Sequence, residues 1–374
     1  MNRALIVTND FPPRAGGIQS FVHGLAACLP PDSVVVYAPR WPGCEAFDAR
    51  QPYPVVRHPT SLMLPTRAVA RRAAELVAEF KCDTVVFGAA APLGLLAPSM
   101  RAAGAGRVVM ITHGHEASWA QVPLARRLLA RIGRHADVVT YLGEYTRQRL
   151  APVIAGGKLV RLAPGVDTGL FRPEAGAGQV RAALGLGDRP VVVCLSRLVP
   201  RKGQDVLLRA WPQVLRAVPD GVLLLVGGGP YRRTLERLAR PMGGSVRIAG
   251  PVSSAALPAY LAAGDVFAMP CRTRLGGIDV EGLGIVYLEA SASGLPVVAG
   301  ASGGAPDAVL QGETGLVVDG TSPAEVAGAL IDLLKDPARA RAMGERGREW
   351  VTREWDWELV AARFARLLEP ARPS

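Results

Sequence analysis

Short apolar runs recur along the whole chain and alternate with longer stretches in which apolar and polar positions follow a helical period. Each run has about the length of one β-strand. They lie at 3–8, 34–39, 83–88, 107–112, 136–141, 190–196, 222–226, 246–252, 265–270, 295–299 and 314–318. A strand of a parallel sheet is covered on both faces, so it reads as a continuous apolar run. The pattern therefore predicts an α/β fold with parallel sheets.

The clearest helical pattern covers residues 66–80. Its apolar positions Val69, Ala73, Leu76, Val77 and Phe80 share one face. Arginines stand beside that face, and an apolar loop at 62–64 precedes it. Four further helices are expected at 17–29, 123–134, 323–334 and 350–368, and the second of these, PLARRLLARIGR, is again basic and amphipathic.

The length of 374 residues predicts two domains. The glycine-rich segment 174–179 is typical of a linker between them. We therefore expect one domain over residues 1–170 and a second over 171–354. We see no internal sequence repeat.

Composition narrows the class of protein. Hydrophobic residues make up 49% of the chain and charged residues 20%, as in a folded globular protein. No apolar run approaches the roughly 20 residues of a membrane span, and the N-terminus reads as a strand and not as a signal peptide. The five cysteines, 28, 44, 82, 194 and 271, form no CxxC pair, which favours reduced thiols in the cytosol and argues against zinc.

The charge is unevenly distributed. The net charge is +11, of which residues 1–170 carry +8 and the remainder +3. A basic half suggests an acidic partner, such as anionic lipid or nucleic acid. An aromatic content of 6% and the lack of a recognisable motif argue against nucleic acid. A membrane surface is the favoured interpretation of the overall charge, although Arg67, Arg71 and Arg72 taken alone are more typical of an ordinary solvated face over a packed core.

Polar and glycine residues follow several predicted strands, where parallel sheets bind ligands. Gly16 and Gly17 open a helix after the first strand, which suits a phosphate but also an ordinary tight turn. The turn is not G-x-G-x-x-G, and no acidic residue ends the second strand, which disfavours a dinucleotide-dependent dehydrogenase. His113-Gly-His-Glu116 ends the strand at 107–112 and suggests a polar ligand contact. As a metal site, His113 and His115 with one carboxylate would be weak.

The second half offers a stronger phosphate site. Arg197 and Lys202 lie between a buried strand and a helix N-terminus, so cations and backbone N–H groups can converge on an anion. In the segment 271–300, Glu281 and Glu289 flank another helix N-terminus, at which Ile285 and Val286 offer backbone N–H groups. Two carboxylates so placed suit hydroxyl groups on either side of a phosphate, as in a nucleotide sugar.

The spacing of Glu281 and Glu289 is the E-x7-E signature, and with it the chain resembles glycosyltransferase family 4. The stretches NDFPPRAGGIQSF, THGHE, SRLVPRKGQD and MPCRTRLGGIDVEGLGIVYLEA occur in the order of that family. They are most similar to actinobacterial GDP-mannose-dependent mannosyltransferases acting on phosphatidylinositol mannosides. The resemblance covers essentially the whole chain.

The resemblance implies a GT-B fold, with two Rossmann-like domains facing a cleft and a C-terminal helix, about 355–374, crossing back to the first domain. It implies retaining mannose transfer from GDP-mannose to a phosphatidylinositol mannoside lipid, by a peripheral enzyme on the cytoplasmic face of the plasma membrane. It also favours a contact of residues 62–72, with Arg67, Arg71 and Arg72, with an anionic membrane surface. Another acceptor, such as glucuronosyl diacylglycerol or a secondary metabolite, or a UDP-sugar donor, is the alternative.

The resemblance also assigns roles to residues. Arg197 and Lys202 meet the diphosphate, His113 and Glu281 the mannose, and Glu289 the ribose. Backbone groups at Gly16, Gly17, Ile285 and Val286 meet donor phosphate or sugar, and the chain near Val252 meets the base. Because no D-x-D motif is present, we expect fixed cations to replace a metal ion.

Overall fold

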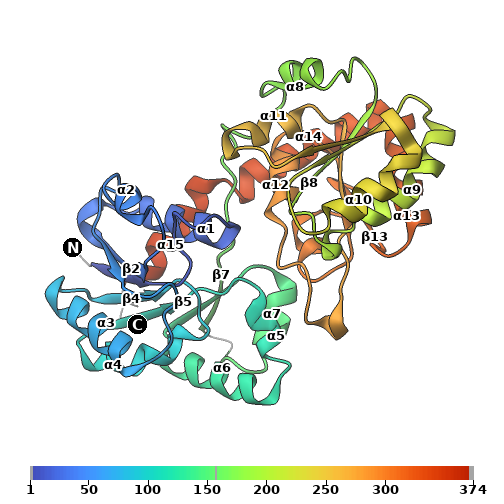
Figure 1. Cartoon of the computed structure of the whole chain (residues 1–374). Helices are drawn as coiled ribbons and strands as arrows, with labels where there is room; N and C mark the ends of the chain where they lie inside the picture. The colour runs from blue at the N-terminus through green and yellow to red at the C-terminus, as the bar shows by residue number, and fades with distance from the viewer. Residues whose placement is uncertain (1–2, 156–157, 370–374) are drawn as a thin grey trace. The chain divides into compact units, whose positions relative to one another are not determined.

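A computed structural model describes residues 3–155 and 158–369. The chain divides into two compact units, one comprising Met1–Pro164 with Glu358–Ser374 and the other Gly165–Trp357. Each unit is built on a single parallel sheet (Figure 1). Two Rossmann-like units of this kind are the architecture that the apolar runs predict.

The first sheet has seven strands in the order β3-β2-β1-β4-β5-β6-β7. Their bounds are β1 Ala4–Val7, β2 Val34–Pro39, β3 Val55–His58, β4 Thr84–Phe87, β5 Arg107–Met110, β6 Val138–Tyr141 and β7 Leu159–Arg161. The order reverses direction between β1 and β4, which pair in register with Ala4 opposite Thr84. This point is where an open parallel sheet binds its ligand.

Helices cover the first sheet because alternate strand residues point to opposite faces. The helices are α1 Gly17–Ala27, α2 Cys44–Asp48, α3 Arg67–Glu79, α4 Ala97–Ala102, α5 His115–Trp119, α6 Pro123–His135 and α7 Glu144–Leu150. One buried cluster joins strand residues such as Val7 and Phe87 to Leu76 of α3 and Ile132 of α6. The last helix, α15 (Trp357–Leu368), belongs to this unit: its terminal carbonyl groups at Leu367 and Leu368 accept hydrogen bonds from Arg107 and Thr84 (Figure 1).

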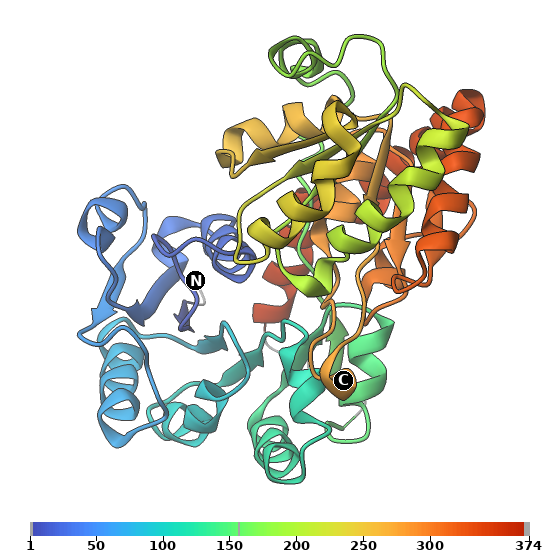
Figure 2. The same ribbon diagram turned by 45° about the vertical axis from the view of Figure 1, so that its right-hand side comes forward.

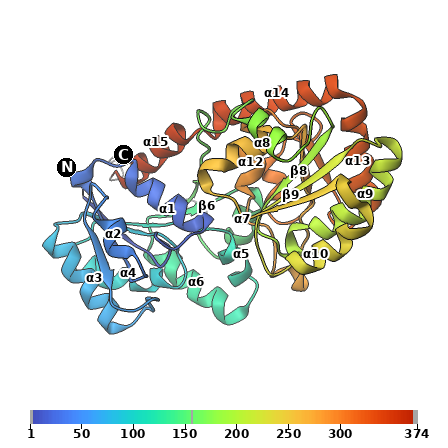
Figure 3. The ribbon, with the colours of Figure 1, turned by 45° about the horizontal axis from the view of Figure 1, so that its top comes forward.

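The second sheet has six strands in the order β10-β9-β8-β11-β12-β13, the same winding as the first. Its strands are β8 Val191–Leu195, β9 Val222–Val226, β10 Val246–Gly250, β11 Val266–Met269, β12 Val297–Gly300 and β13 Gly315–Val318. Its helices are α8 Ala177–Ala183, α9 Gln204–Ala217, α10 Arg232–Ala239, α11 Leu257–Ala262, α12 Ile285–Ala292, α13 Pro323–Lys335 and α14 Pro337–Glu354. Figure 3 shows α9 and α13 side by side against this sheet.

The expected single helix at 350–368 is wrong. The structure ends α14 at Glu354 and begins α15 at Trp357. Between them Asp356 forms a parallel β-bridge with Val166. The N–H of Val166 donates to the carbonyl oxygen of Trp355, and the carbonyl oxygen of Val166 accepts from the N–H of Trp357. These backbone bonds replace the helical ones and interrupt the helix.

No helix in the described part of the chain is both long enough and apolar enough to cross a bilayer. The five cysteines are free thiols, and all except the half-buried Cys28 are buried. The five thiols thus contribute to the fold by packing, and no disulfide joins them in this structure.

Candidate active site

The second unit places two loops at the point where its strand order reverses. The loop after β8 carries Arg197 and Lys202, and the loop after β11 carries Glu281. Gly203, between Lys202 and α9, has a φ of +75°, and a Cβ there would lie 1.9 Å from the carbonyl oxygen of Pro270. Glycine is therefore required for the two loops to approach each other.

Lys202 and Glu281 form the centre of this region. The ammonium Nζ of Lys202 lies 2.7 Å from Oε2 of Glu281, and the two residues are 9% and 6% exposed. Arg201 adds a second cation, with its Nε 3.6 Å from the same carboxylate oxygen. Sequence analysis predicted Lys202 and Glu281 but not Arg201.

These cations control the ionisation of Glu281. Burial alone would raise the pKa of its carboxyl group, but the charges of Lys202 and Arg201 outweigh burial and hold the pKa below its usual value. Arg197, which is exposed, contributes in the same direction. Glu281 is therefore a carboxylate at neutral pH.

The loop after β11 is braced against the start of α9. Arg201 donates to Asp279 at 2.8 Å, and Arg272 pairs with the buried Asp205 at 3.0 Å. Arg274 and Asp279 close the loop on itself by backbone hydrogen bonds of 2.9 and 3.2 Å. Figure 2 shows the loop as an orange excursion ending in a short turn. The Arg201–Asp279 and Arg272–Asp205 pairs connect positions more than 60 residues apart, so no local sequence signal identifies them.

Glu289 lies on α12 in a different environment. Within the described residues, no hydrogen bond or ion pair reaches its carboxyl group. Burial raises its pKa to about 7. At the start of the same helix Gly284 is left-handed, with a φ of +79°, and the N–H groups of Ile285 and Val286 have no partner within the helix. The helix end thus offers donors to an anion, and Glu289 offers an unused polar group nearby along the helix.

Val252 follows β10, the edge strand of the same sheet, and is half-buried. The three-glycine segment after β9 lies close by, because Gly227 donates its N–H to the carbonyl of Gly250 at 2.8 Å. The structure thus brings the backbone near Val252 to the same end of the sheet as Arg197 and Lys202.

In the first unit, Gly16 and Gly17 begin α1, as predicted. Gly17 is exposed, and a Cβ added there would meet no atom within 4 Å. The fold itself therefore does not require glycine at this position. Gln19, the third residue of α1, is buried, and its side-chain amide donates a hydrogen bond of 2.7 Å to the carboxylate of Asp10. This bond connects the start of the helix to the preceding loop.

His113 lies near the start of α1. Its ring packs edge-on against Phe21 of that helix, with 6.0 Å between ring centroids. Its Nε2 is hydrogen-bonded to the carbonyl oxygen of Gly88, so Nε2 carries the proton. Burial lowers the pKa of the ring, although Glu116 opposes this. The ring is therefore neutral at neutral pH, and its Nδ1 is a hydrogen-bond acceptor.

Glu116 has a role that the predicted site did not include. It is fully buried, and its Oε2 accepts the backbone N–H of His113 at 2.9 Å. Its Oε1 lies 3.2 Å from Nε2 of the half-exposed His115. Glu116 therefore fixes the backbone that carries His113.

The arginines of α3 are partly neutralised. Arg71 lies 3.8 Å and Arg72 3.3 Å from Glu75, and Arg72 also lies 3.4 Å from Glu79. In the preceding loop Leu62 and Leu64 are 54% and 52% exposed, but Met63 is fully buried. The predicted apolar loop is thus exposed at two of its three positions, because Met63 belongs to the core.

The described residues bring together no group of three or more His, Cys, Asp or Glu side chains suited to a metal ion. The second unit instead offers two cations, the buried Lys202 and the half-buried Arg201. It also offers the ionised Glu281, the weakly acidic Glu289 and the N-terminus of α12. Fixed cations and N–H groups of this kind stabilise negative charge that develops on a leaving phosphate.

Comparison with known proteins identifies the family. The pattern of the family described as "Glycosyltransferase Family 4" matches residues 15–170, and that of "Glycosyl transferases group 1" matches residues 179–350. The two matched segments include every residue of the predicted site.

Full-length relatives agree with these matches. The chain is 55% identical to a GDP-mannose-dependent α-(1-6)-phosphatidylinositol monomannoside mannosyltransferase of Mycolicibacterium smegmatis, over 98% of each chain. It is 47% identical, also over 98% of each, to a GDP-mannose-dependent monoacylated α-(1-6)-phosphatidylinositol monomannoside mannosyltransferase of Corynebacterium glutamicum.

Solved structures agree on the fold. Anabaena HepE in complex with UDP superposes with a TM-score of 0.83 at 19% identity, covering 98% of this chain and 99% of that one. Sucrose-phosphate synthase from Thermosynechococcus elongatus gives 0.79 at 24%, covering 98% of each. The fold is therefore GT-B, as expected, and the chain belongs to glycosyltransferase family 4.

Proposed function

We propose that this protein transfers mannose from GDP-mannose to a phosphatidylinositol monomannoside lipid, forming an α-(1-6) linkage with retention of configuration. Relatives of that description are 54–55% identical along the whole chain. The observation that carries the proposal is the ion pair of Lys202 and Glu281 beside the N-terminus of α12, in a chain so closely related to mannosyltransferases.

The proposed reaction breaks the bond between the anomeric carbon of mannose and the diphosphate oxygen of GDP. Negative charge develops on the diphosphate, where Lys202, Arg197 and the N–H groups of Ile285 and Val286 stabilise it. A bond then forms to the acceptor hydroxyl oxygen on the same face, and the hydroxyl proton passes to the departing phosphate. This front-side course retains configuration without a carboxylate nucleophile.

The two carboxyl groups act on different sugars in this proposal. Glu281, ionised and held by Lys202, accepts hydrogen bonds from mannose hydroxyls. Glu289 accepts from the ribose, and its lack of protein partners supports a role in binding a ligand. Backbone at Val252 meets the base, while Gly16 and Gly17 approach donor phosphate or sugar.

His113 is proposed to contact the mannose. Its Nε2–H donates to the carbonyl oxygen of Gly88, so Nδ1 remains to accept a hydrogen bond from a sugar hydroxyl. A neutral ring suits this task, because a protonated ring could only donate. Burial, the main cause of the lowered pKa, supplies that neutrality.

We propose no metal requirement, because fixed cations take the place of a metal ion at the leaving group. We also propose a peripheral position on the cytoplasmic face of the plasma membrane, where a lipid acceptor would be found. The α3 region contributes to this contact through Arg67, Arg71, Arg72 and the exposed Leu62 and Leu64.

The experiment is transfer of radiolabelled mannose from GDP-mannose into extracted phosphatidylinositol mannoside lipids, with EDTA present. Label in a more polar lipid is expected. If calorimetry shows binding of GDP but no lipid is labelled, the proposed acceptor is contradicted. Failure of both, followed by transfer from a UDP-sugar, would overturn the donor, and activity abolished by EDTA alone would overturn metal independence.

A further inference from the structure

The structure contains a second basic surface in the first unit, on helix α6. We define this α6 surface by Val122, Leu124, Arg126, Arg127, Arg131 and Arg134. The six side chains lie on or just before the helix Pro123–His135, and all six residues are exposed. The helix contains no acidic residue.

The exposed face of α6 is continuous. Leu124, Arg127, Arg131 and Arg134 follow one another at spacings of three, four and three, so they share one side of the helix. The opposite side is buried through Leu129, Ile132 and Gly133. The helix is thus anchored in the core of its unit while it displays one leucine and three arginines to solvent.

The charges of this surface are not neutralised by the protein. Within residues 3–155 and 158–369, none of its four arginines pairs with a carboxylate. The next two acidic side chains along the chain are already engaged: Asp137 pairs with Arg101, and Glu144 pairs with Arg147 at 2.7 Å. Lys158 adds positive charge at the helix end, where its Nζ donates to the carbonyl oxygens of Gly133 and Arg134.

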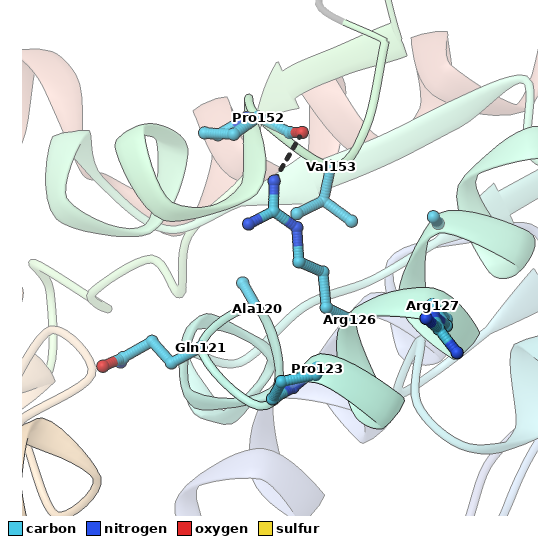
Figure 4. Close-up of a pocket in the computed structure, with 8 residues that line it drawn as sticks. Ala120, Gln121, Pro123, Arg126, Arg127, Pro152 and Val153 are labelled. Carbon is cyan, nitrogen blue, oxygen red and sulfur yellow. Dashed lines mark hydrogen bonds between the residues drawn. The ribbon is translucent and has the colours of Figure 1, made fainter.

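A hollow lies beside the surface. It has a volume of about 440 Å³ and is lined by Gln121, Pro123, Arg126, Arg127 and Pro152, among others. Figure 4 shows Arg126 extending from α6 to the carbonyl oxygen of Pro152, a long contact of 3.4 Å. Arg127 forms another part of its wall.

Exposed apolar side chains add a second property. Val122 is 47% and Leu124 is 69% exposed, the latter among the most exposed large apolar residues described. Apolar residues at the rim of an arginine-rich helix are typical of surfaces that lie in the interface of an anionic bilayer. A soluble polyanion would use the charges but gain nothing from Leu124.

We propose that the α6 surface docks on the headgroups of an anionic phospholipid bilayer, and that it contributes more to this contact than α3 does. Helix α3 carries three arginines, but two of them are paired with glutamates on the same helix. The inference rests on the proposed lipid acceptor, because an enzyme that modifies a membrane lipid must reach its surface.

The test compares two matched triple variants. Arg127, Arg131 and Arg134 are changed together to Ser, which spares the hydrogen-bonded Arg126. The control changes Arg67, Arg71 and Arg72 to Ser and removes the same charge. Both are mixed with sedimentable vesicles of equimolar phosphatidylcholine and phosphatidylglycerol, or of phosphatidylcholine alone, and thermal unfolding confirms that each variant folds.

The α6 triple variant should lose about 100-fold in partition to the anionic vesicles, since each of the three surface cations contributes about fivefold. The α3 triple variant should lose less than about tenfold. Leu124→Ala should weaken partition a few-fold further, at high salt as well as low. An equal or larger loss in the α3 variant, or unchanged partition in the α6 variant, would overturn the proposal.

Two further experiments distinguish a lipid surface from a site for phosphate ions, and the docking proposal from the proposed function. Inorganic phosphate should displace the protein from vesicles no better than sulfate at equal ionic strength; stronger displacement would indicate a phosphate-ion site instead of a lipid surface. Mannose transfer to acceptor dispersed in detergent micelles should be nearly unchanged in the α6 variant. If wild-type protein gives no transfer in micelles, the proposed function is contradicted. The vesicle measurement does not depend on transfer and still tests the docking proposal.

Discussion

Glu281 and Glu289 are the same residue type, eight positions apart, yet the structure treats them in opposite ways. Glu281 ends a loop and is surrounded by Lys202 and Arg201, which lower its pKa. Glu289 lies on the following helix without a charged partner, and burial raises its pKa to about 7. Glu281 is buried and Glu289 is half-buried, and the cations beside Glu281 outweigh the effect of burial that acts unopposed on Glu289. One group is therefore fixed by the protein, and the other is left available to a ligand.

The strongest test of this difference is to remove the cation. Lys202→Met should reduce mannose transfer by about 10²–10³-fold, because the variant loses the preorganised charge that we propose to act on the leaving diphosphate. The rate at saturating GDP-mannose measures this effect. Lys335→Met, on the second unit but away from the site, is the control. Transfer within a few-fold of wild type in Lys202→Met would remove Lys202 from the reaction.

The second test removes the paired carboxylate. Glu281→Gln leaves Lys202 buried without its counter-ion, so the free energy of unfolding at pH 7 should fall by about 3 kcal/mol. Denaturant unfolding measures it. The pKa of Glu281 is lowered, so its contribution is present above about pH 4.5, the usual value, and is lost as the pH falls further. The deficit should therefore shrink in acid, and the double variant with Lys202→Met should recover part of the stability.

Glu289 should show the opposite sign. Its raised pKa means that the folded state holds a proton which the unfolded state releases between pH 4.5 and about 7, so wild-type stability falls across that window. Glu289→Gln avoids this cost. In ligand-free protein the variant should be about 3 kcal/mol more stable than wild type at pH 8 and equally stable at pH 4. A variant that is less stable at pH 8 would show that Glu289 has a stabilising partner.

A third carboxyl group, that of the fully buried Glu116, sharpens the comparison. Glu116 holds the backbone N–H of His113, a neutral donor, instead of a cation. Glu116→Gln retains an acceptor oxygen, so the free energy of unfolding should change by less than about 1 kcal/mol. Glu116→Ala, which leaves that N–H without its partner, should lose about 1–3 kcal/mol. Thermal unfolding of both variants distinguishes a hydrogen-bond role from a role that needs the charge.

Sequence patterning predicted much of the fold because buried parallel strands are apolar throughout. Strand β2 occupies the predicted residues 34–39, and α3 differs by one residue at each end from the predicted 66–80. Strand β3 (Val55–His58) was missed, because this edge strand is only half-buried and includes Arg57 and His58. The break between α14 and α15 was missed because it depends on a backbone bridge to Val166, which is distant in sequence.

The sequence proposes Lys202, Glu281 and Glu289 as site residues because each belongs to a recognisable motif, and these assignments stay predictions. Arg201, Asp279 and Asp205 could not be predicted, because their pairings join the loop and helix that follow β8 to the loop after β11. Nor could the sequence show that Glu281 is paired and Glu289 is not, since that depends on which cations the folded loops bring together.

The central claim is that the two carboxyl groups act on different sugars of the donor. The most direct measurement is calorimetric binding of GDP and of GDP-mannose to Glu281→Gln and Glu289→Gln. We expect Glu289→Gln to weaken both ligands by the same factor, because both contain the ribose. Glu281→Gln should weaken GDP-mannose more than GDP, because only the former contains mannose. An equal loss for both ligands in Glu281→Gln, or a loss confined to GDP-mannose in Glu289→Gln, would contradict the account.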